Sequence, residues 1–117
     1  MNEQEIQAAE FQIEQMQKII ESINSQLNEV AHTIEALMEL KSLNNNAEIL
    51  FPVANGIFVK GTISDTQNLS INVGNNVVVE KTINQSIEMM QKQFSEINDY
   101  KKQLEKQLDD MLKKLQE

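Results

Sequence analysis

The feature that most constrains this chain is a hydrophobic repeat with alternating steps of three and four residues, which occurs twice. It runs almost without interruption from Ile6 to Leu37, and again from Ile87 to Leu115. Such steps average about 3.5 residues, the heptad spacing of a left-handed coiled coil. The intervening positions are Gln, Glu, Asn and Lys, so the apolar stripe is narrower than on a helix of a globular core. The two parts therefore predict two long helices that pair with each other.

The middle segment, residues 47–82, has a different pattern, in which apolar residues alternate along short runs. The Asn55–Gly56 pair is the strongest short hairpin signal, because both residues tolerate positive φ, and Gly74–Asn76 marks a second turn. The segment thus predicts four strands in two successive hairpins. Pro52 cannot donate a ladder hydrogen bond, so we expect it at a sheet edge or a bulge.

The chain is expected to form one domain in three parts. These are an N-terminal coiled-coil helix over residues 1–46, two β-hairpins over residues 47–82 and a C-terminal coiled-coil helix over residues 83–117. The Asn44–Asn46 run is expected to end the first helix, since Asn accepts a left-handed conformation. The sequence Thr82–Gln85 fits a capping box that opens the second helix. The predicted fold class is α+β, a long antiparallel coiled-coil hairpin with two β-hairpins inserted between its helices.

Antiparallel pairing of the two helices also predicts a register. The numbers of facing residues have a constant sum in such a hairpin, and the two repeats match when Ile23 faces Leu104. A heptad repeat leaves a slip of one heptad open. In the predicted register, residues 1 to about 10 extend beyond the C-terminal end of the second helix.

The β segment has too little core of its own to be stable alone, and it exposes two sheet edges. Leu50, Phe58 and Val78 lie on the face opposite the main apolar set. Open edges with a second apolar face favour assembly with other subunits, although folding back on the chain's own coiled coil is the alternative. The residues expected at an oligomer interface are Leu50, Phe51, Val53, Phe58, Val59, Ile63, Leu69, Ile71, Val73, Val77, Val78 and Val79.

The far end of the coiled coil carries apolar residues beyond the seam, among them Phe11 and Leu112. They predict a flexible apolar tip that binds exposed hydrophobic segments of another protein, with methionines adding adaptable contact area. The alternative is that they are frayed helix ends whose apolar residues complete the seam. The residues expected at the tip are Ile6, Phe11, Met16, Ile19, Met111, Leu112 and Leu115.

Composition argues against several classes of function. The chain has 18 acidic residues and 10 basic residues, and every basic residue is Lys. The net charge of −8 argues against a nucleic-acid binder. With one His and no Cys it lacks thiolate sites and paired-His sites, and His32 and Asp109 are expected to be solvated. No apolar run approaches the roughly 18–20 residues of a membrane span. We therefore expect no enzyme, no cofactor, no metal site and no membrane association.

The order of helix, two hairpins and helix, with heptads in both arms, closely resembles a prefoldin subunit of the archaeal alpha type. Residues 49–63, which include Leu50-Phe51-Pro52, resemble the first hairpin of that family. Residues 72–82, with the sequence Val-Gly-Asn-Asn-Val-Val-Val-Glu-Lys, resemble its second hairpin. Two hairpins mark the alpha class of prefoldin, whereas the beta class has one.

The resemblance implies a hexamer of two alpha and four beta subunits, in which the hairpins form a β-barrel platform that bears coiled-coil tentacles. It also implies a cytoplasmic, ATP-independent holdase, whose partners are unfolded client proteins at the tips and a group II chaperonin that receives them. One alternative is a structural scaffold or filament assembled through the β-hairpins. Another is a nucleic-acid-facing adaptor, against which an acidic chain without Arg counts.

Overall fold

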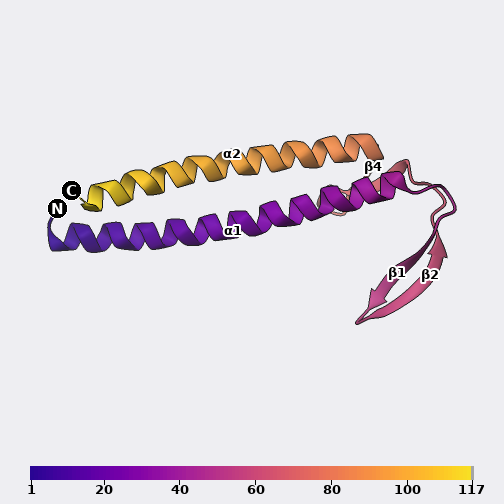
Figure 1. The fold of residues 1–117 in the computed structure, drawn as a ribbon, viewed down its shortest axis with the longest axis horizontal. Helices are drawn as coiled ribbons and strands as arrows, with labels where there is room; N and C mark the ends of the chain where they lie inside the picture. The colour runs from indigo at the N-terminus through magenta and orange to yellow at the C-terminus, as the bar shows by residue number, and fades with distance from the viewer. Residues whose placement is uncertain (117) are drawn as a thin grey trace. The chain divides into compact units, whose positions relative to one another are not determined.

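The computed structural model describes residues 1–116 and confirms the predicted order of helix, two hairpins and helix (Figure 1). The elements are α1 (Glu3–Ser42), β1 (Glu48–Ala54), β2 (Ile57–Thr62), β3 (Asn68–Asn72), β4 (Val78–Thr82) and α2 (Ile83–Gln116). The chain divides into two compact units. The coiled-coil unit contains Met1–His32 and α2 from Lys92 onward, and the hairpin unit contains Thr33–Gln91.

The heptad positions form the core of the coiled-coil unit, as their spacing predicts. Ile23, Leu27 and Leu104 are buried in one cluster, against which Ile20, Phe94 and Ile97 pack. Lys101, at a seam position, is half-buried. The first turns of α1 and the last turns of α2 lie at the same end of this unit, so the helices are antiparallel (Figure 1).

The predicted overhang of the N-terminus is wrong. Met111 and Lys114 of α2 line a pocket together with Met1, which precedes α1, and with Ala9 and other residues of the first turns of α1. Residues among the first dozen of the chain therefore lie beside the last turns of α2. The predicted register, in which Met111 lies opposite Met16, does not allow this contact.

The contacts of the two helices do not all follow the predicted register. Ile23 shares its cluster with Leu104, but it also lines a pocket with Ile97 and Tyr100. Ile97 precedes Leu104 by one heptad, and a slip of one heptad is what the repeat leaves open.

In the hairpin unit each hairpin is a separate antiparallel two-stranded sheet, β1 with β2 and β3 with β4. Asn55 and Gly56 have φ values of 45° and 81°, as a tight hairpin turn with two left-handed residues requires. The Gly74–Asn76 turn likewise has positive φ at all three residues. The ladder shifts register between Pro52 and Ala54, which confirms the predicted bulge at the proline.

Side-chain hydrogen bonds define the junction of β4 and α2. The Thr82 hydroxyl accepts from the Gln85 backbone N–H at 3.1 Å, and the Gln85 side chain accepts from the Thr82 N–H at 3.0 Å. This reciprocal pair is the predicted capping box. At the other junction α1 ends at Ser42, before the asparagine run that was expected to stop it. Asn46 does adopt the left-handed conformation, with φ of 70°, but it belongs to the connection to β1.

Candidate interaction surfaces

The first hairpin exposes apolar side chains on both of its faces. On one face Val53 keeps 63% of its surface exposed, and on the other Phe58 keeps 55%. Because the two strands form a complete sheet by themselves, both outer edges also lack a neighbouring strand within residues 1–116. The predicted interface residues Leu50, Phe51, Val53, Phe58 and Val59 are all exposed here, and Ile63 is half-buried.

Phe51 has a specific position on this hairpin. Its ring covers Gly61 on β2, so closely that a Cβ at residue 61 would lie 2.5 Å from the Phe51 Cε2 atom. Gly61 faces Ile49 in the ladder, and Phe51 faces Val59. The ring therefore lies diagonally across the ladder, in the space left by the missing side chain.

The second hairpin differs because one of its faces is partly covered. Leu69 and Ile71 of β3 are half-buried and line a pocket of about 300 Å³ with residues of both helices. The helical residues of this pocket include Leu37, Leu40 and Met90. The alternative of a hairpin that folds back on its own helices thus holds for this one face. Val73, Val77 and Val78 remain exposed, and Val79 is half-buried.

The loops between the helices and hairpins are held by a small polar network. The Asn45 side-chain oxygen accepts from the backbone N–H and the hydroxyl of Thr66, at 3.1 and 3.2 Å. The Asp65 carboxylate accepts from the backbone N–H groups of Gln67 and Asn68 and from the Asn68 side chain. The Asn68 side-chain amide and then the two backbone donors hold the pKa of Asp65 below its ordinary value, because they stabilise the charged form.

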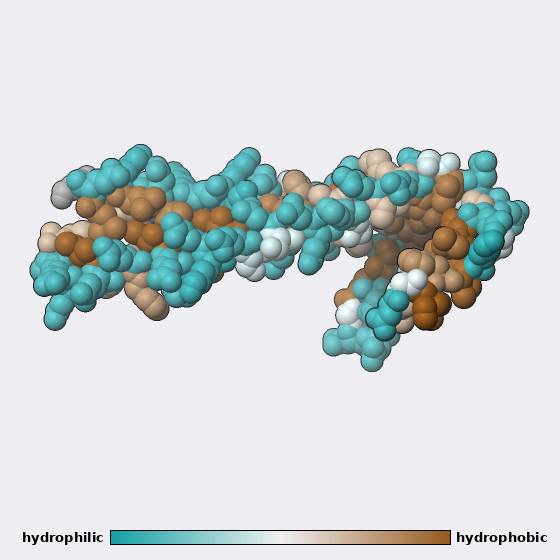
Figure 2. All heavy atoms as spheres, turned by 60° about the horizontal axis from the view of Figure 1, so that its bottom comes forward, coloured by the Kyte–Doolittle hydropathy of each residue, from teal (hydrophilic) through white to brown (hydrophobic). Residues whose placement is uncertain are grey.

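The predicted tip residues fall into two groups. Met16, Met111 and Leu115 are half-buried seam residues. Phe11 is 62% exposed and Leu112 39% exposed, and Ile6 and Ile19 are exposed as well. Figure 2 shows the hydrophobic residues of this unit as a stripe between the helices, with polar residues outside it. The apolar surface at this end therefore consists of a few side chains on the outer sides of the seam.

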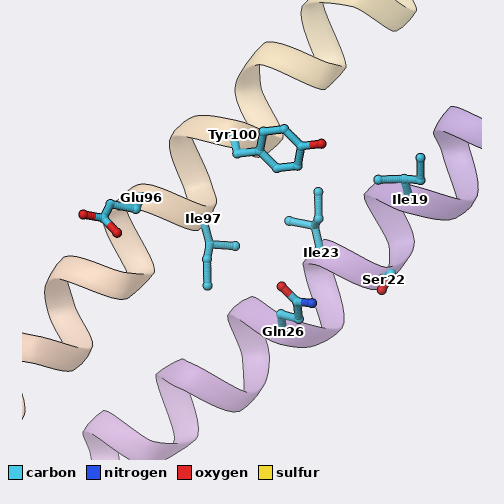
Figure 3. A pocket seen from close by; sticks show the side chains of 7 residues that line it. All are labelled: Ile19, Ser22, Ile23, Gln26, Glu96, Ile97 and Tyr100. Atoms are coloured by element: carbon cyan, nitrogen blue, oxygen red, sulfur yellow. The ribbon is translucent and has the colours of Figure 1, made fainter. Parts of the chain in front are cut away.

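Ile19 takes part in a further feature, a pocket of about 420 Å³ along the coiled coil. Figure 3 shows Ile97 and Tyr100 of α2 facing Ile19 and Ile23 of α1, whereas the Glu96 carboxylate points away. Ile19 thus lies beside the middle of the seam and not at its end. Tyr100 was missed in the sequence because it lies one position before the seam residue Lys101, where the repeat assigns no core role.

Other exposed apolar residues were also missed by the sequence reasoning. Ile57, at the start of β2, is 61% exposed, and Met38 and Leu43 of α1 are exposed in the same unit. The alternation along β2 was the available signal for Ile57. Within residues 1–116, no helix combines the length and the apolar character that crossing a membrane requires.

Two antiparallel helices joined through two open hairpins define a coiled-coil hairpin protein with inserted β-hairpins. A family model described as prefoldin subunit matches residues 9–117. The chain belongs to the prefoldin family, as a subunit of the archaeal alpha type.

Several archaeal relatives support this assignment. Prefoldin subunit alpha of Pyrococcus horikoshii is 31% identical over 97% of this chain and 82% of its own length. Prefoldin subunit alpha of Thermofilum pendens is 31% identical over 73% of this chain and 66% of its own length. Among solved structures, a chain of filamentous prefoldin from Methanocaldococcus jannaschii superposes with a TM-score of 0.83. That comparison covers 99% of this chain and 95% of the other at 18% identity, and it shows the shared fold.

Proposed function

We propose that this chain is a subunit of an ATP-independent holdase that captures unfolded proteins at its coiled-coil tips. In the proposal the hairpins assemble with beta subunits into a hexamer of two alpha and four beta chains. Captured clients pass from the tips to a group II chaperonin. The single observation that carries the proposal is the first hairpin, which exposes apolar side chains on both faces and has two unpaired edges.

An isolated two-stranded hairpin is marginally stable in water, and an exposed edge invites pairing with another strand. The first hairpin nevertheless forms a ladder from Glu48–Thr62 to Ala54–Ile57, interrupted by one bulge. Strands of neighbouring subunits would cover its edges, and their side chains would cover Leu50 and Phe58. Figure 2 shows hydrophobic residues gathered on this part of the hairpin unit, with a polar end. Assembly through the hairpins accounts for both features.

Client capture is proposed for the exposed group of tip residues. Each apolar side chain that a client covers contributes roughly 1.5–3 kcal/mol. One tip with Phe11 and Leu112 therefore binds weakly and releases quickly. Several tips on one assembly raise the effective concentration of binding sites, which converts weak contacts into useful avidity without new contacts.

Suppression of client aggregation tests the capture step. We expect the triple variant Ile6→Ser, Phe11→Ser and Leu112→Ser to lose most protection of a denatured client, with and without ATP, in an assembly of unchanged mass. The matched control is Phe94→Leu, which changes a half-buried seam residue that no client would touch. If the triple variant protects the client as well as the wild type, the tips are not the binding site.

A second candidate function is a structural filament assembled through the same hairpins. The observation that favours it is the solved neighbour of this fold, which is described as filamentous prefoldin. Native mass spectrometry of the chain, alone and with a beta-class subunit, separates the two. A closed assembly that forms with the partner supports the hexamer, whereas open-ended growth of this chain alone supports the filament. A pure scaffold would also be unaffected by the triple tip variant.

A further inference from the structure

The turn of the first hairpin places a chemically labile sequence on the surface. Asn55 is followed by Gly56, and both residues are exposed at the tip of the β1–β2 ladder. We propose that Asn55 is a site of spontaneous deamidation, which adds a negative charge and an altered backbone to this turn. The proposal concerns the hairpin itself and does not depend on the proposed chaperone function.

The reaction needs the backbone nitrogen of the residue that follows the asparagine. The Gly56 nitrogen, once it has lost its proton, attacks Asn55 Cγ and forms a new C–N bond. The bond from Cγ to Nδ2 breaks, and the Nδ2 group takes up a proton from water, which replaces the one that Gly56 gave to the solvent, and leaves as ammonia, so a five-membered succinimide ring remains. Water then opens the ring at either carbonyl, which gives aspartate or isoaspartate at residue 55. The step consumes water alone and involves no oxidant or reductant.

Access to the attacking nitrogen is set by the side chain of the following residue. Gly56 has no Cβ, and an added Cβ at this position would meet no atom within 4 Å. Neither a side chain of residue 56 nor a neighbouring atom therefore blocks the approach to the Gly56 nitrogen. Elsewhere in the chain the residue that follows an asparagine carries a side chain, as at Asn75 and Asn76 in the second hairpin. Those side chains hinder the approach.

The Asn55 side chain is also unrestrained, since no hydrogen bond holds it among residues 1–116. Hydrogen bonds hold the side chains of other asparagines. The Asn72 oxygen accepts from the Gly74 N–H at 2.9 Å, and the Asn68 amide donates to Asp65 at 2.9 Å. Such hydrogen bonds fix the amide group away from the backbone nitrogen. Asn55 combines an unrestrained amide with an unhindered nucleophile.

The turn must open for the ring to close, because closure requires rotation about the Asn55 Cα–C bond, which the tight hairpin turn restricts. A two-stranded hairpin frays readily at its tip, so this opening is a local event. Isoaspartate then inserts an extra methylene into the main chain of a two-residue turn. The Ala54–Ile57 pair that closes the ladder loses its geometry as a result.

Site-resolved mass spectrometry of the full chain in mildly alkaline buffer tests the proposal. The product is heavier than the parent by about 1 Da, and isoaspartate is recognised by its altered fragmentation. We expect residue 55 to convert about ten times faster than Asn75 and Asn76, because the residues that follow those two carry side chains and Gly56 does not. The rate should rise with pH, since the Gly56 nitrogen must lose its proton.

The matched control is Gly56→Asn, which keeps a residue that tolerates positive φ but adds a Cβ, for which there is space. This variant should lower the rate at residue 55 to that of Asn75, with the β1–β2 amide signals of the turn unchanged in an NMR spectrum. An unchanged rate in Gly56→Asn overturns the proposal. So does a wild-type rate at residue 55 no greater than at Asn75.

Discussion

The substitution Phe58→Asp is the sharpest test of the assembly surface. Phe58 lies on β2, keeps 55% of its surface exposed and faces Pro52 across the ladder. Because it contributes little to the packing of the subunit itself, the fold should survive the change. The substitution should instead weaken the contact with the subunit that covers Phe58.

The size of the effect follows from the exposed area. A phenylalanine that is fully covered buries about 150–250 Å², so covering the exposed part of Phe58 removes about 100 Å² from water. At about 25 cal/mol per Å² this contributes about 2.5 kcal/mol to association. A carboxylate in its place must also lose its water without a partner, which adds a cost of about 1–3 kcal/mol. A total of about 4 kcal/mol weakens the interface by about a thousandfold.

Analytical ultracentrifugation at low micromolar concentration measures this effect. We expect the variant to sediment as the 13.4 kDa monomer under conditions in which the wild type is assembled. Its helix content by circular dichroism should match that of the wild type, since Phe58 lies outside both helices. The matched control is Phe58→Leu, which keeps most of the apolar contact and should remain assembled. If Phe58→Asp keeps the mass of the wild-type assembly, this face of β2 is not an interface.

Three further predictions concern the hairpin unit. Gly61→Ala should destabilise the hairpin by about 1 kcal/mol, because the added Cβ meets the Phe51 ring. This is the low end for overpacking, since the partly exposed ring can move aside. Adding Phe51→Val should restore the stability in urea. Thr82→Ala should cost about 1 kcal/mol in urea unfolding through loss of the cap to Gln85, whereas Thr82→Ser should cost little. The pKa of Asp65 is lower in the folded state than in the unfolded state, so the charged Asp65 carboxylate stabilises the fold. This contribution is fully present above the unfolded pKa near 3.8, and it is lost as pH falls through the folded pKa. Acid titration should therefore show a smaller loss of stability below pH 3.8 for Asp65→Ala than for the wild type, and an equal loss would contradict this role.

Local rules predicted the elements of this fold because their causes lie within a few residues. The Asn55–Gly56 turn forms because both residues accept positive φ. The capping box forms because Thr82 and Gln85 are three residues apart at a helix start. Even the bulge beside Pro52 follows from a single missing N–H group. None of these depends on a distant contact.

The candidate surfaces were predictable to a lesser degree. Alternation along the strands identified Phe58 as an apolar residue on a second face, and the structure leaves it exposed. The same alternation did not separate the two hairpins, although Leu69 and Ile71 are partly covered by the helices and the first hairpin is not. At the tip, the repeat separates Met111, a half-buried seam residue, from Phe11, which lies outside the seam and is exposed.

The sequence by itself determined that two heptad helices enclose two hairpins, since hydrophobic period and turn chemistry are properties of short segments. The tertiary structure alone decided the register of the helices, in which Met111 lies beside the first turns of α1. A heptad pattern repeats every seven residues, so pairings displaced by one heptad bury similar apolar area. The choice among them rests on how side chains interdigitate across the seam around Ile23 and Leu104, and on the length of connection that the hairpins impose. Those are relations between distant residues, which a periodic pattern does not specify.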